Sequence, residues 1–178
     1  MAGENKEPWL NYLALTTVIL AVCATLSTFK GGGYSTRSVM SQTQASDQWS
    51  YYQSKSIKSY LYEMQKDKFE LELKTAGVRI PKETSGEYEK KIADYGTKIA
   101  KYEKEKAEIQ NEAKRFETIR NDAQKHSQIF GIAVIYLQIA ILLSSIAALM
   151  KKKALWVLGV VIGLAGVVYF ANGFLLFF

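Results

Sequence analysis

The sequence has 178 residues, of which 48% are hydrophobic and 22% charged, and its formal net charge is +6. It contains one histidine and one cysteine, which excludes an intrachain disulfide and any metal site built from several His or Cys ligands. Basic residues are mixed with acidic ones along the chain, so we expect no nucleic-acid partner. We find no catalytic constellation, metal site or cofactor motif, and therefore expect neither enzyme activity nor a cofactor.

Three uncharged apolar segments interrupt the polar sequence, at residues 9–29, 129–150 and 154–178. Because about 20 apolar residues in a helix cross the hydrocarbon core of a bilayer, we predict an all-α membrane protein with three transmembrane helices. A tail at 1–8 precedes the first helix, and its two Glu and one Lys favour an uncleaved anchor over a signal peptide or lipoprotein signal. No segment contains an ionisable Asp, Glu, Lys, Arg or His, which argues against an ion-coupled transporter.

Small residues recur in the apolar segments at spacings that allow close helix packing. The first segment carries Ala14, Thr17 and Ala21. The last carries Gly159, Gly163, Gly166 and Gly173. These residues can pack the three helices of one chain together or join copies, and we expect a homo-oligomer.

Residues 30–128 form a charged segment between the first two apolar helices, and we predict an antiparallel helical, coiled-coil hairpin. Its arms cover about 38–76 and 85–128, its tip covers 77–84, and at about 1.5 Å per residue it reaches roughly 60 Å. Three glycines at residues 31–33 predict a hinge before the first arm. Gly77 is a predicted C-cap, Pro81 breaks the helix, and Thr84 with Glu87 predicts a capping box that restarts it.

The second arm has a repeat of seven residues that predicts a coiled-coil seam. The seam residues are Tyr88, Ile92, Tyr95, Ile99, Tyr102, Ile109 and Phe116. This register continues without a break into the second apolar segment, which predicts one helix to Met150. In the first arm, a helical stripe of apolar residues, flanked by Phe69 and Leu73, consists of Trp49, Tyr52, Ile57, Leu61, Met64 and Leu71.

The stretch QASDQWSYYQSKSIK at residues 44–58 is polar but rich in aromatic residues. One interpretation packs Trp49 and Tyr52 against the second arm near Phe116 and Ile119. The other makes this base of the arm a subunit contact. The contact residues would be Asp47, Gln48, Trp49, Tyr52, Gln53 and Lys55.

Four stretches of the sequence resemble a bacterial membrane family known as domain of unknown function 4337. They are WLNYLALTTVILAVCATLS, QASDQWSYYQSKSIK, YEKEKAEIQNEA and the lysine triplet at 151–153. The resemblance covers nearly the whole chain and implies this topology, but it implies no activity.

The lysine triplet, Lys151, Lys152 and Lys153, forms a short basic loop between the last two apolar helices. Positive charge in short loops favours the cytoplasmic side, which predicts a cytoplasmic N-terminus and loop, and a periplasmic hairpin and C-terminus, in the bacterial inner membrane. Basic residues at the feet of the hairpin favour the reverse orientation. We also expect the triplet to attract anionic lipid headgroups.

Two functions fit these features. The first is a non-enzymatic oligomeric membrane scaffold, or an accessory subunit of a larger membrane complex, that projects a coiled-coil arm. The alternative is a passive channel formed by a homo-oligomeric ring, which the threonine-rich face of the first apolar helix suggests.

Overall fold

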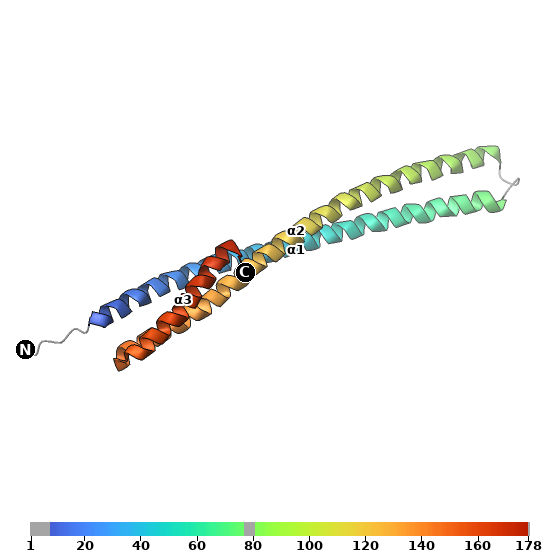
Figure 1. The fold of residues 1–178 in the computed structure, drawn as a ribbon. Helices are drawn as coiled ribbons and strands as arrows, with labels where there is room; N and C mark the ends of the chain where they lie inside the picture. The colour runs from blue at the N-terminus through green and yellow to red at the C-terminus, as the bar shows by residue number, and fades with distance from the viewer. Residues whose placement is uncertain (1–7, 77–80, 178) are drawn as a thin grey trace, which may run out of the picture. The chain divides into compact units, whose positions relative to one another are not determined.

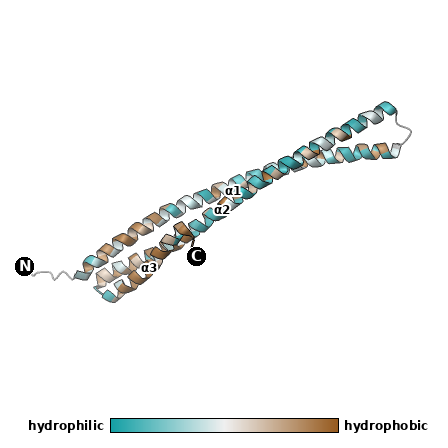
Figure 2. Cartoon of the chain, turned by 45° about the horizontal axis from the view of Figure 1, so that its top comes forward, coloured by the Kyte–Doolittle hydropathy of each residue, from teal (hydrophilic) through white to brown (hydrophobic). Residues whose placement is uncertain are grey.

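The computed structural model describes residues 8–76 and 81–177, and within them the chain is all-α. This part of the chain has three helices: α1 (Pro8–Ala76), α2 (Lys82–Met150) and α3 (Lys153–Leu175) (Figure 1). All three contain a stretch that is long and apolar enough to cross a membrane. Figure 2 shows the apolar residues concentrated on α3 and on the parts of α1 and α2 beside it.

The predicted hinge at residues 31–33 is wrong, because α1 runs through all three glycines as helix. Helical glycine costs about 1 kcal/mol relative to alanine, and contacts with α2 act against that cost at Gly31. Its carbonyl accepts a hydrogen bond of 3.1 Å from Ser127 Oγ, and a Cβ at this position would lie 3.0 Å from Phe130 Cβ. The first apolar segment and the first arm are therefore one helix of 69 residues. A two-helix hairpin of α1 and α2 replaces the predicted series of membrane helix, hinge and separate arm.

Helix α2 is continuous from Lys82 to Met150, which confirms the single helix predicted from the seven-residue repeat. It begins before Thr84, so the predicted capping box is wrong. The Ser85 amide instead donates a 3.0 Å hydrogen bond to the carbonyl of Pro81, which closes the first turn. The predicted C-cap at Gly77 lies outside the described residues.

The chain divides into two compact units, which we name by their composition. The apolar unit contains residues 1–40 and 119–178, and the charged unit contains residues 41–118. The charged unit has fifteen basic and fourteen acidic residues, whereas the rest of the chain has eight basic and three acidic ones. Most of the net positive charge therefore belongs to the apolar unit.

The apolar unit is a three-helix bundle held by small side chains and apolar side chains. One buried cluster joins Leu20 and Ala24 of α1 to Leu137 and Ala140 of α2. Large apolar side chains also cover the outside of the bundle; Phe29, for example, is 76% exposed. An outward-facing apolar surface of this kind is typical of a protein surrounded by lipid.

The connection between α2 and α3 is a tight turn formed by the lysine triplet. Lys151 adopts a left-handed conformation with φ of 51°, and the Lys152 amide donates a 3.2 Å hydrogen bond to the carbonyl of Ala147. This left-handed turn is a common way to end a helix. All three lysines are exposed, and Lys153 is the first residue of α3.

Candidate functional site

Trp49, the largest side chain of the QASDQWSYYQSKSIK stretch, contacts α2 of its own chain. Its indole Nε1 donates a 2.9 Å hydrogen bond to Glu117 Oε1, and its ring meets Tyr52 edge-on with centroids 5.6 Å apart. A partly buried tryptophan needs an acceptor for its N–H, but the sequence did not identify Glu117 as that acceptor. Within the charged unit, Trp49 thus joins the two helices of the hairpin.

Lys55 is also engaged within the chain, in an ion pair with Glu105. The Lys55 Nζ lies 2.6 Å from Glu105 Oε2, and the Lys55 side chain is only 15% exposed. The hydrogen bond to Glu105 raises the pKa of Lys55, and the same bond lowers the pKa of Glu105. Both groups therefore stay charged over a wider pH range than they would alone.

A second polar cluster lies on the seam, where Lys106 interrupts the apolar residues. Lys106 Nζ donates a 2.7 Å hydrogen bond to Glu103 Oε1, which also accepts one of 3.1 Å from Ser59 Oγ. This hydrogen bond between Lys106 and Glu103 lowers the pKa of Glu103 and raises the pKa of Lys106. Lys106 is buried, so its pairing with Glu103 allows a charged residue at a seam position.

The predicted seam of α2 faces α1 through interleaved aromatic rings. Tyr62 of α1 lies between Tyr95 and Tyr102, with centroids 5.3 and 5.9 Å away. Phe69 contacts Tyr88, 4.9 Å away, and Tyr95, 6.0 Å away. The other predicted seam residues are also half-buried or buried: Ile92, Ile99, Ile109 and Phe116. The seam is thus occupied within the chain.

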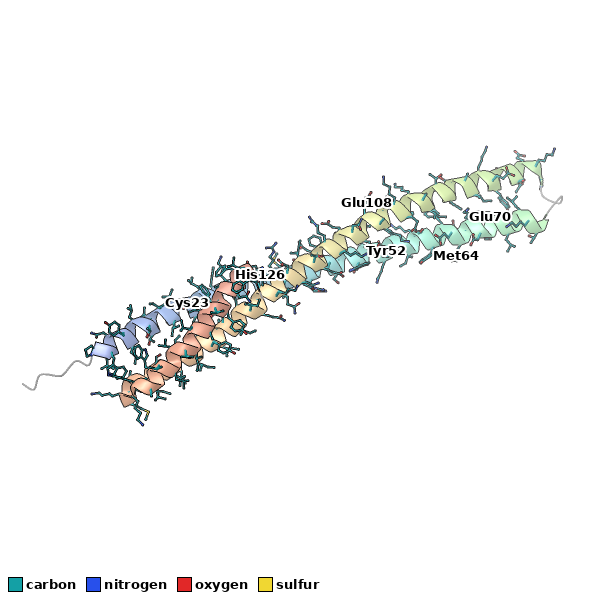
Figure 3. The ribbon with its side chains drawn as sticks, in the orientation of Figure 1. Cys23, Tyr52, Met64, Glu70, Glu108 and His126 are labelled. Atoms are coloured by element: carbon teal, nitrogen blue, oxygen red, sulfur yellow. The ribbon has the colours of Figure 1, made fainter. Side chains whose placement is uncertain are left out.

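The apolar stripe predicted on the first arm does not form a single face. Its flanking residue Phe69, together with Tyr62, packs against α2 as described above. Five large apolar side chains of this stretch of α1 are more than half exposed, and we name them the exposed α1 face. They are Ile57, Tyr60, Leu61, Met64 and Leu71. Met64, labelled in Figure 3, is 67% exposed. At the edge of this face, the Lys106 ammonium of α2 lies over the Tyr60 ring, 5.8 Å from its centroid.

The remaining residues of the predicted subunit contact differ in exposure. Asp47 and Gln53 are exposed, whereas Gln48 is half-buried. Gln53 lies four residues before Ile57 and so shares its side of the helix. A subunit contact at this stretch stays a prediction, and only Asp47 and Gln53 are free enough to serve it.

The predicted glycine stripe of α3 lies against the other helices of the same chain, and all four glycines are buried. A Cβ at Gly166 would lie 2.8 Å from Leu137 Cγ, and one at Gly163 would lie 2.9 Å from Leu20 Cδ2. Gly159 meets Ala140 and Ser144, and Gly173 meets Phe130. In the first segment, Ala14 is exposed while Thr17 and Ala21 are half-buried.

The one histidine lies at a junction of all three helices. His126 Nδ1 is 2.7 Å from the carbonyl oxygen of Gly173 near the end of α3, and its ring stacks on Tyr34 with centroids 4.4 Å apart. Figure 3 places His126 beside the end of α3. Through these contacts His126 of α2 connects α1 and α3. Among the described residues, no group of three or more His, Cys, Asp or Glu could hold a metal ion.

These features define an all-α protein. One unit has an exposed apolar surface compatible with contact with lipid, and the other is a charged pair of helices. Residues 9–176 match the family described as Domain of unknown function (DUF4337). The chain belongs to this family, which confirms the resemblance in the sequence. Neither the curated proteins nor the solved structures contain a match to the chain.

Proposed function

We propose that the protein is a non-enzymatic, homo-oligomeric membrane scaffold or accessory subunit. The apolar stretches of α1, α2 and α3 cross the membrane, and the charged unit extends from it as a helical hairpin. The outward-facing apolar side chains of the apolar unit support the membrane placement. We propose the bacterial inner membrane, with the lysine triplet in the cytoplasm among anionic lipid headgroups and the hairpin in the periplasm.

The observation that carries the oligomeric scaffold is the exposed α1 face. Ile57, Met64 and Leu71 are seven residues apart, and their exposed fractions are 61%, 67% and 61%. The rest of this unit is rich in charged residues. Apolar residues that recur at every seventh position of such a helix are typical of a surface that packs against another helix. Since α2 already occupies the opposite side, a second chain covers this face.

The size of the effect favours association. Burying a large apolar side chain stabilises a complex by about 1.5–3 kcal/mol before the entropic cost of association. Tyr60 and Leu61 enlarge the same surface, and Gln53 lies at its end nearer the membrane. These residues form an apolar centre with a polar edge, as in stable protein interfaces.

A passive channel receives less support from the structure. The threonine hydroxyls that suggested a pore donate to their own helix: Thr17 to the Leu13 carbonyl, Thr25 to that of Ala21 and Thr28 to that of Ala24. Hydroxyls whose protons are bound in this way do not donate hydrogen bonds to a passing anion. We therefore favour the scaffold.

The test is the size of the full-length protein in mild detergent. We expect wild type to be an oligomer, and Ile57→Ser/Met64→Ser to shift it to a smaller species with unchanged helix content by circular dichroism. A matched control, Lys104→Ser/Asn111→Ser, changes two exposed α2 residues at the same spacing and should keep the wild-type size. A monomeric wild type without a bound partner would contradict the proposal.

A further inference from the structure

Two unpaired cations lie one above the other at the end of the apolar stretch of α1. Lys30 and Arg37 are seven residues apart, which places them on the same side of the helix two turns apart. Both are exposed, and neither forms an ion pair within the described part of the chain. Unlike the cations of the charged unit, these two have no acidic neighbour on their own helix nearby.

The surface between these cations is hollow. A hollow of about 640 Å³ is lined by Thr28, Phe29, Lys30, Gly32, Gly33, Tyr34 and Arg37. Gly33 lies in this lining between the two cations, three residues after Lys30 and four before Arg37. A Cβ at Gly33 would meet nothing within 4 Å, so packing within the chain does not require a glycine here. A glycine inside a helix costs about 1 kcal/mol of stability relative to alanine. A glycine that no packing contact requires therefore suggests that the open space beside it has a use.

We propose that this hollow binds the headgroup phosphate of an anionic phospholipid. Lys30 and Arg37 hold the phosphate by charge-assisted hydrogen bonds, and the absence of a side chain at Gly33 lets it approach the helix. The inference rests on the proposed membrane placement of α1, which puts the hollow at the level of the headgroups.

Phe29 selects a lipid over a free phosphate ion. It lies four residues before Gly33, on the same side of the helix, and it is 76% exposed at the edge of the hollow. A headgroup bound between Lys30 and Arg37 would place its acyl chains along this ring and the apolar surface below it. Inorganic phosphate would gain nothing from that contact.

Native mass spectrometry of the full-length protein in detergent tests the site. We expect one phosphatidylglycerol retained per chain, with phosphatidylcholine held about tenfold more weakly because it has no net negative charge. Lys30→Gln/Arg37→Gln should weaken retention about tenfold, and Gly33→Leu, which fills the hollow, should abolish the retained lipid. Two controls should retain it: Lys125→Gln removes a nearby exposed charge, and Gly96→Leu fills open space in the charged unit.

The outcomes separate this site from its alternatives. Equal loss in Lys125→Gln would mean diffuse attraction to a basic surface, and equal retention of phosphatidylcholine would mean no selection by charge; either result overturns the proposal. Displacement of the lipid by millimolar inorganic phosphate would identify a free anion as the ligand and overturn it as well. If wild type remains an oligomer but retains no lipid, this inference fails while the proposed scaffold stands.

Discussion

The ion pair of Lys55 with Glu105 ties α1 to α2 through two groups whose pKa values move apart. The lowered pKa of Glu105 gives stability that is present above its unfolded pKa, about 4.3, and is lost as pH falls through its folded pKa. The raised pKa of Lys55 gives stability that is present below about 10.4 and is lost as pH rises through its folded pKa. The pKa of Glu103 is likewise lowered and that of Lys106 raised, so this second pair adds stability over the same pH range.

We therefore predict a broad stability plateau from about pH 5 to pH 10, with a fall on both sides. The measurement is thermal unfolding of the full-length protein in detergent, followed by circular dichroism. Replacing both partners, as in Lys55→Met/Glu105→Met, should make the fall shallower at both ends. An unchanged profile in this variant would show that the pair does not couple protonation to folding.

Single residues also show what could be predicted from the sequence. The composition and spacing of the stretch around Trp49 predicted either packing against the second arm or a subunit contact, and the structure shows Trp49 bound to Glu117 of α2. The partners Glu117 and Glu105 were not predictable, because the relative register of two helices in a hairpin depends on the tip and on packing along the whole seam. Many glutamates in α2 satisfy the local pattern equally well.

At the scale of elements, the seven-residue repeat predicted α2 and its seam because each seam residue reports on the same contact surface. The glycines at residues 31–33 misled the prediction for a different reason. Their low helix propensity is a local property, while the contacts of Gly31 with Ser127 and Phe130 come from residues about 100 positions away. Tertiary contact outweighed propensity there.

The close contact of α3 with α2 predicts that a larger side chain at Gly166 destabilises the bundle. In Gly166→Leu, the new side chain meets Leu137, whose Cγ and backbone nitrogen lie 2.8 and 3.1 Å from the ideal Cβ. Overpacking of this kind costs about 1–3 kcal/mol, and more if α3 must move away. We expect a lower thermal midpoint in detergent, whereas Gly131→Leu, where a Cβ meets nothing within 4 Å, should keep the wild-type midpoint. Equal midpoints in both variants would contradict the close packing of α3 on α2.

At the scale of the whole molecule, the distribution of charge explains why the sequence gives two opposing signals for the membrane orientation. The apolar unit carries basic residues beyond both ends of its apolar stretches: Lys30, Arg37, Arg120 and Lys125 beside the hairpin, and the lysine triplet at the α2–α3 turn. Among its described residues only Asp122 is acidic. Each end thus meets the rule that positive charge favours the cytoplasmic side. The orientation that we propose follows the short loop, because long segments are less bound by that rule.

A pair of single cysteines tests both the crossing and its direction. In a Cys23→Ala background, Glu83→Cys places a thiol in the first turn of α2, and Lys152→Cys places one at the α2–α3 turn; both positions are exposed. If α2 crosses the membrane, an impermeant maleimide added to intact spheroplasts labels only one of them, and lysis makes both reactive. Labelling at residue 83 alone is the expected result, since the lysine triplet is then cytoplasmic. Labelling at residue 152 alone would reverse the orientation, and labelling at both before lysis would overturn the membrane crossing itself.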